Sequence, residues 1–85
     1  MVLEYDPEAD AIYNRLRQLP YAYNRELDDS RIIDYAVDQK PIGIELLNVS
    51  LGIDLNFLPE REAVGRLLRE NGIKIVEQPA TVRET

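Results

Sequence analysis

Short segments in which apolar and polar residues alternate fill the first half of the sequence, and they limit what the chain can fold into. A two-residue period rich in β-branched and aromatic side chains is the signature of half-buried strands. Turn-forming residues separate the segments at intervals of about 8–12 residues, which favours an antiparallel meander. We therefore predict an α+β fold whose meander of four to six short strands is drawn from residues 2–5, 11–17, 21–27, 31–37 and 42–47.

Residues 8–17 fit two kinds of element. In a strand, Ile12, Asn14 and Leu16 would share one side of the sheet. In a helix, one face would carry Ala9, Ile12, Tyr13 and Leu16, because three- and four-residue spacings meet on a helix surface. The aromatic and β-branched content favours the strand, and the helix remains the alternative.

One helix is predicted near residues 59–71, where it would cover the apolar face of the sheet. Pro59 suits the first helical turn, because the N–H that proline lacks has no partner there. Gly72 suits the left-handed position that follows the last turn. The residues expected to face the sheet are Ala63, Val64, Leu67 and Leu68.

The chain of 85 residues has room for one hydrophobic core. Residues 73–76 are predicted to add a last strand after the helix. The residues that follow are polar and contain few apolar side chains, as is typical of chain ends that fray. We therefore assign residues 1–76 to a single α+β domain and residues 77–85 to a frayed C-terminal tail.

The sequence contains no cysteine and no histidine. It therefore has no thiol nucleophile, no cysteine-ligated zinc site and no Ser-His-Asp arrangement. Histidine is also the commonest general base and the commonest transition-metal ligand. Asp34 and Glu45 lie in predicted strands and are interpreted as solvent-exposed charges rather than as an acid–base pair. We expect a protein that is not an enzyme and that has no cofactor.

The acidic cluster of Asp6, Glu8 and Asp10 has the alternate spacing with which a calcium loop begins. The rest of that loop is missing. Ala11 stands at the sixth position, where a glycine turns the chain, and Arg17 stands at the twelfth, where a glutamate binds the ion. Turn formation explains the acidic residues without a cation, so we expect no metal site.

The net charge of −6 comes from acidic residues spread along the chain. An acidic domain repels a phosphate backbone, which disfavours nucleic-acid partners, whereas a basic protein partner is compatible with this charge. No segment approaches the roughly 20 apolar residues that span a bilayer, so we expect no membrane association. The first residues do not resemble a signal peptide, and we expect a cytoplasmic location.

Three blocks of sequence resemble a known family. They are residues 5–13 (YDPEADAIY), 32–35 (IIDY) and 41–47 (PIGIELL). In this order they resemble domain-of-unknown-function family 2283, small proteins of bacteria and archaea, over about residues 2–50. Lys40 stands where the family customarily has a glycine before Pro41, which alters the expected hairpin. The resemblance implies a compact cytoplasmic sheet-and-helix domain, assigns no activity or functional residue, and hints at antitoxin-type relatives.

A protein-interaction module that forms a homodimer is the function we expect. Five tyrosines, one phenylalanine and no tryptophan give aromatic surface with a polar tip, which interfaces favour. The chain also has more aliphatic residues than one sheet face and one helix stripe require. Two alternatives stay open: an acidic antitoxin-like partner of a small basic toxin, and a small-ligand binder or minimal enzyme with a site at a subunit interface. The residues predicted to form the partner or dimer surface are Tyr13, Tyr21, Tyr23, Leu51, Ile53, Leu55 and Phe57.

Overall fold

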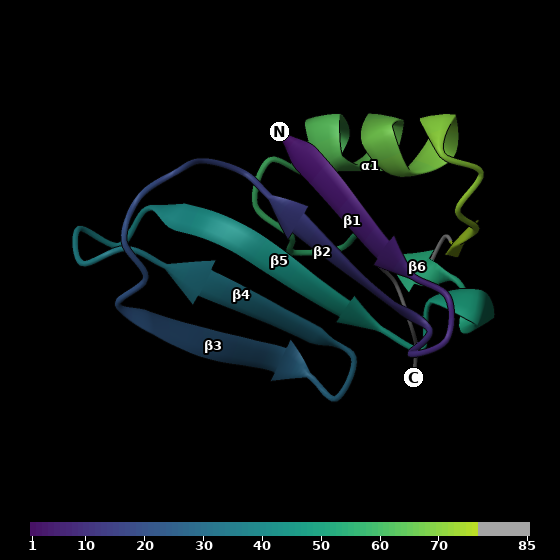
Figure 1. Ribbon diagram of the computed structural model, residues 1–85, viewed down its shortest axis with the longest axis horizontal. Helices are drawn as coiled ribbons and strands as arrows, with labels where there is room; N and C mark the ends of the chain where they lie inside the picture. Colours follow the sequence, from purple (N-terminus) through teal and green to yellow (C-terminus); the bar gives the residue numbers. More distant parts are fainter. Residues whose placement is uncertain (77–85) are drawn as a thin grey trace, which may run out of the picture.

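The computed structural model describes residues 1–76 and shows a five-stranded antiparallel sheet with one helix (Figure 1). The predicted α+β class is therefore confirmed. The strands of this sheet are β1 (Val2–Asp6), β2 (Ala11–Arg15), β3 (Tyr23–Asp28), β4 (Arg31–Tyr35) and β5 (Pro41–Leu47). The remaining elements are the 3-10 helix η1 (Val49–Leu51), β6 (Ile53–Asp54), the helix α1 (Arg61–Glu70) and β7 (Ile75–Val76).

The strand order in the sheet is β1-β2-β5-β4-β3, which departs from the order of a simple meander. The chain leaves β2 for β3 at the far edge, and two hairpins then bring β5 back to pair with both β2 and β4 (Figure 1). In β5, Ile42, Ile44 and Leu46 are 6%, 0% and 0% exposed. A strand at the centre of a sheet is shielded from water by a neighbour on each side. The central position between β2 and β4 therefore suits this apolar strand.

Residues 8–17 form a turn followed by a strand, so the strand prediction is confirmed and the helical alternative is wrong. The Asp6 carboxylate accepts hydrogen bonds from the N–H groups of Glu8 at 3.1 Å and Ala9 at 3.3 Å. This is the local turn chemistry of aspartate, and it closes the connection from β1 to β2. Ile12 and Leu16 then point to the same, buried face of the sheet.

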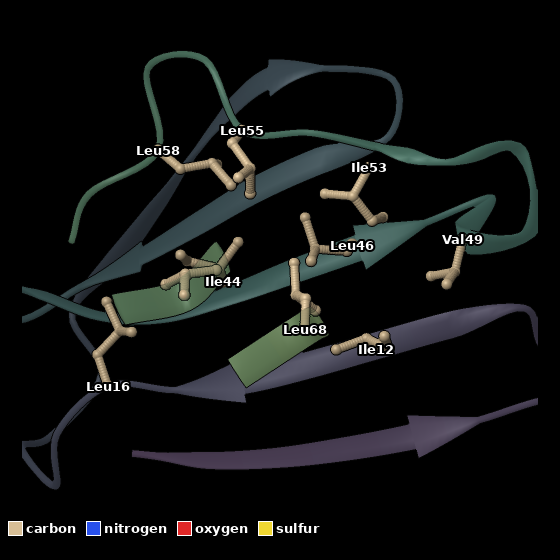
Figure 2. Packing of buried hydrophobic residues seen from close by; sticks show 10 residues of the cluster. Ile12, Leu16, Ile44, Leu46, Val49, Ile53, Leu55, Leu58 and Leu68 are labelled. Atoms are coloured by element: carbon tan, nitrogen blue, oxygen red, sulfur yellow. The ribbon is translucent and has the colours of Figure 1, made fainter. Parts of the chain in front are cut away.

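One face of the sheet is covered by α1 and by residues 49–58. Figure 2 shows Leu68 of α1 beside Ile12 and Leu46 of the sheet, with Leu55 and Leu58 above the neighbouring strands. The buried cluster consists of Ile12, Leu16, Ile44, Leu46, Val49, Ile53, Leu55, Leu58, Val64 and Leu68. The core is therefore a two-layer arrangement in which the segment before the helix supplies part of the second layer.

This packing corrects the interpretation of residues 51–58. Ile53 and Leu55 are only 3% and 8% exposed and belong to the core of the chain itself. Ile53 also pairs with Ile75 in the parallel ladder of β6 and β7. These aliphatic side chains fill the part of the sheet face that one short helix leaves bare, so they are not available to the partner surface predicted for them.

Helix α1 begins at Arg61, two residues later than predicted, because Glu60 has φ of 52° in the left-handed region. Val64 and Leu68 are completely buried, as the apolar stripe predicted. Leu67 is only half-buried, since it lies on the flank of the helix rather than against the sheet. The helix therefore makes its principal contact through one residue per turn.

The end of α1 follows the prediction. Gly72 has φ of 73°, and its N–H donates to the carbonyl of Arg69 at 3.0 Å. The N–H of Ile73 donates to the carbonyl of Leu68 at 3.0 Å, so the last turn is capped by backbone groups. The predicted last strand is confirmed as β7, and the tail predicted over residues 77–85 lies outside the described residues.

Candidate functional site

The second face of the sheet is covered by no helix or strand of residues 1–76. Two rows of side chains on this face cross all five strands through directly paired positions. The first row is Glu4, Tyr13, Glu45, Ile32 and Glu26, and the second is Val2, Arg15, Gly43, Asp34 and Asn24. We call these ten residues the open face.

A hydrogen bond between two of these side chains spans the centre of the open face. The hydroxyl of Tyr13 on β2 donates to Oδ2 of Asp34 on β4 at 2.9 Å, across the intervening strand β5. Both residues are half-buried. The second carboxylate oxygen of Asp34 has no hydrogen-bond partner among residues 1–76 and can accept one from a bound molecule.

Gly43 makes this bond possible. A Cβ built on Gly43 would overlap the Oη and Cζ atoms of Tyr13, so the ring can cross β5 only over a residue without a side chain. The guanidinium of Arg15 lies 5.7 Å from the centre of the same ring, within reach of a cation–π interaction. Tyr13 is thereby fixed against the sheet, and its ring forms part of a rigid surface.

Burial of the ring, followed by the hydrogen bond to Asp34 and its negative charge, raises the pKa of Tyr13 from 10.0 to about 12. The hydroxyl therefore stays a neutral donor throughout the physiological range. Asp34 in turn stays hydrogen-bonded through one oxygen. Because the one phenolic proton is donated to Asp34, this pair offers a partner acceptors only, namely the hydroxyl oxygen of Tyr13 and the second carboxylate oxygen of Asp34.

The raised pKa of Tyr13 predicts a fall in stability at alkaline pH. Between pH 10 and about 12 the unfolded chain releases the phenolic proton while the folded chain keeps it, so the free energy of unfolding decreases as pH rises. Tyr13→Phe should remove this part of the decrease. Urea midpoints from pH 8 to 11 measure it, with Tyr5→Phe, an exposed tyrosine, as the control. Equal pH slopes in wild type and Tyr13→Phe would contradict the prediction.

The structure separates the tyrosines that were predicted to form one patch. Tyr13 points to the open face, whereas Tyr23 stacks on Tyr35 on the other face, with ring centres 5.1 Å apart. Two strands, β5 and β4, also lie between β2 and β3, so Tyr13 and Tyr23 are not on neighbouring strands. Tyr21 is 58% exposed in the connection that precedes β3. A patch shared by Tyr13 and Tyr23 would need the two residues on adjacent strands, and the observed strand order separates them.

Two further residues of the predicted surface are exposed. Leu51 is 73% exposed in η1, and Phe57 is 84% exposed in the turn before α1. Phe57 has φ of 70°, a left-handed conformation that bulky residues rarely adopt. These two side chains remain available to a partner, but neither belongs to the open face.

Asp6 and Asp10, two of the acidic residues of the first turn, accept hydrogen bonds from the chain itself. Both carboxylate oxygens of Asp10 accept hydrogen bonds from Ser50, one from its N–H at 2.8 Å and one from its hydroxyl at 2.7 Å. The contact joins the β1–β2 turn to η1. Within residues 1–76, no group of three or more potential metal-ligating side chains is found.

A hollow of ≈ 690 Å³ lies away from the open face, between α1 and the β6–β7 pair. Its charged lining consists of Asp54, Arg61, Glu62, Arg66, Arg69 and Glu70. Three positive and three negative side chains cancel, so the hollow selects neither sign of ligand. It also contains no combination of nucleophile and base.

The site residues selected from the sequence include Tyr13, but they include neither Asp34 nor Gly43, which complete its contact on the open face. Asp34 was interpreted as a solvent-exposed charge, and its bond to Tyr13 corrects that interpretation, whereas Glu45 is exposed as expected. A signal for the site was present, because an isolated glycine inside a strand marks a close approach of other atoms. Gly43 fits that description.

Comparisons with known proteins match one part of the chain. No curated protein and no solved structure matches it. In residues 1–76 no helix has the length and apolar character needed to cross a membrane. The family model described as "Protein of unknown function (DUF2283)" matches residues 3–50, which include β2 to β5, all of β1 except Val2, and every residue of the Tyr13–Asp34–Gly43 contact. Since the match covers more than half of the chain, the protein belongs to the DUF2283 family.

Proposed function

We propose that this domain is a non-enzymatic protein-interaction module that binds its partner through the open face. The observation that carries the proposal is a sheet with one face buried under α1 and the other uncovered by residues 1–76. Tyr13 and Ile32 are half-buried on the uncovered face, whereas the uncovered face of an antiparallel sheet is commonly polar and solvated. A partly apolar, rigid face with one free acceptor on Asp34 suits a protein surface.

The flatness of the open face supports binding over catalysis. The hollow that touches it, of ≈ 200 Å³, is lined by residues of β1 and β2 with Glu45 and is smaller than the clefts that usually hold small ligands. Tyr13 is held as a neutral donor rather than as a base. The Tyr13–Asp34 pair is suited to hydrogen bonding with a partner, and it offers no group poised to take a proton near neutral pH.

Site-specific photo-crosslinking tests the proposal. A benzophenone amino acid is placed at Glu45 on the open face or at Glu70 on α1, two exposed positions on opposite sides of the sheet. We expect the probe at Glu45 to form one defined protein adduct in the native cells and the probe at Glu70 to form none. Adducts from Glu70 alone, or from neither position, would refute the assignment of the open face.

Self-association is the second candidate, favoured by the exposure of Leu51 and Phe57. The same experiment separates it from binding to another protein. A second copy of the chain gives an adduct of twice the chain mass, with the probe at Phe57 more efficient than the probe at Glu45. A larger or smaller adduct identifies a different protein.

A further inference from the structure

The open face is strongly acidic. Its two rows carry Glu4, Glu26, Asp34 and Glu45, and the single cation on them is Arg15. The three glutamates are exposed and form neither an ion pair nor a hydrogen bond with any residue of 1–76. Their charges are therefore free to interact with a partner.

The glutamates are also evenly spaced. In the first row they alternate with Tyr13 and Ile32, so each glutamate lies two strands from the next. Neighbouring strands lie about 4.8 Å apart, which gives roughly 10 Å between successive glutamates and about 5 Å from each glutamate to the apolar side chain beside it. Charge and apolar contact thus alternate along a straight line across the sheet.

The spacing between residues on one face of an α-helix nearly matches the spacing of these glutamates. One helical turn rises about 5.4 Å, and residues seven apart recur on one face after about 10.5 Å. Cations at positions i, i+7 and i+14 would reach the three glutamates, and apolar residues one turn away would lie over Tyr13 and Ile32. The flexible stem of lysine absorbs the remaining mismatch of about 2 Å.

Charge excludes other occupants. Two copies joined through the open face would bring eight carboxylates and two arginines together, because each copy contributes Glu4, Glu26, Asp34, Glu45 and Arg15. Nucleic acid is repelled by the same surface. A partner with complementary charge is the one that gains from both steering and contact.

We propose, building on the proposed function, that the open face docks a basic helix of another protein, with its cations on Glu4, Glu45 and Glu26 and apolar residues over Tyr13 and Ile32. The helix axis crosses the strands. The free oxygen of Asp34 accepts a hydrogen bond from a polar group on the side of this helix. The domain thereby selects partners by charge spacing as well as by sign.

The test uses an 18-residue helical peptide with lysines at i, i+7 and i+14 and leucines one turn from each. Calorimetry at about 150 mM salt, where surface charges are screened beyond about 8 Å, measures its affinity for the full chain. Glu45→Lys should weaken binding at least about tenfold, which corresponds to about 1.4 kcal/mol. Glu70→Lys changes the net charge by the same amount on the helix side and should leave the affinity unchanged. Circular dichroism confirms that both variants fold.

A second peptide with the same composition, but with lysines and leucines on opposite faces, is expected to bind at least about tenfold more weakly. Equal loss in the Glu45→Lys and Glu70→Lys variants, or equal affinity for both peptides, would overturn the proposal. So would self-association of the chain that Glu45→Lys abolishes. A photo-crosslinked partner at Glu45 without peptide binding would leave the proposed function standing and refute the basic helix alone.

Discussion

Leu68→Ala is expected to lower the free energy of unfolding by about 2–5 kcal/mol, the range for buried leucine truncations. Leu68 is 0% exposed and is the helix residue that packs among Ile12 and Leu46 of the sheet (Figure 2). Its loss removes apolar burial and leaves a cavity at the helix–sheet contact. Because a domain of this size has little stability to spare, the variant should be close to unfolding. Urea denaturation monitored by circular dichroism measures the change.

Leu67→Ala is the matched control, since it deletes the same atoms one residue earlier in α1. Leu67 is only half-buried, so we expect a loss of about 1 kcal/mol, near the average for point substitutions. If the two variants lost equal stability, α1 would be rotated from the position described for it. If neither lost more than about 0.5 kcal/mol, the helix would not contribute to the core.

Leu67 and Leu68 show which features of α1 can be predicted from the sequence. Three- and four-residue spacing predicted that Ala63, Val64, Leu67 and Leu68 share one face of α1, and in the structure two of them are fully buried and two are half-buried. The period cannot say which residue lies at the centre of the face, because the sheet decides the rotation of the helix. Local patterns therefore predicted the elements and their faces, and tertiary packing set the burial of each side chain.

The strand order could not be predicted from local sequence patterns, because it also depends on tertiary packing. Each strand was predicted from its own residues, but the pairing of β2 with β5 joins Ala11 to Leu47 across a long stretch of chain. Only the summed burial of all strands favours that pairing over the meander order. The contact of Tyr13 with Asp34 depends on it, since β5 must lie between β2 and β4 for Gly43 to pass under the ring. The candidate site was therefore hidden together with the strand order.

Asn14 is a buried polar residue whose energetic cost could not be predicted from the sequence. Alternation placed it on the same side as Ile12 and Leu16, and the structure buries it completely among apolar residues. Neither its amide nitrogen nor its amide oxygen has a hydrogen-bond partner among residues 1–76. A buried unpaired amide costs about 1–3 kcal/mol, and no pattern in the sequence signals such a cost. This amide lowers the stability of the face that α1 covers.

Arg31 ties the segment before α1 to the sheet, and its position gives the second large prediction. One nitrogen of its guanidinium donates to the carbonyl of Asp54 at 2.8 Å and to that of Asn56 at 2.6 Å, while the others bind the Asp28 carboxylate at 2.9–3.0 Å. Arg31 is 8% exposed, so its bonds to the two carbonyls are shielded from water. They hold residues 54–56 over the sheet.

Burial of Asp28 acts to raise the pKa of its carboxyl, but the hydrogen bonds from Arg31 and Ser30 and the charge of Arg31 outweigh it, so this pKa is lowered. The folded chain therefore keeps the Asp28 charge at pH values where the unfolded chain is protonated. The stability that this pair contributes is present above the ordinary aspartate pKa of 3.8 and is lost as pH falls below it.

Arg31→Met is expected to lower the free energy of unfolding by about 3 kcal/mol, the upper range for hydrogen bonds to a charged group, because the methionine keeps the apolar stem and removes every donor. The carbonyls of Asp54 and Asn56 lose that donor, and the acid-induced fall in stability below pH 4 should become shallower because Asp28 loses its cation. Arg31→Lys, which restores one point charge but not the planar fork, should recover only part of the loss.

Asp28→Asn is the control. Its carboxylate is about half exposed, so its removal should cost no more than about 1 kcal/mol. Urea midpoints at pH 3.5 and 7 distinguish these outcomes. A full recovery by lysine would mean that Arg31 acts through charge alone, and an unchanged midpoint in Arg31→Met would mean that residues 53–58 are held over the sheet by their leucines without it.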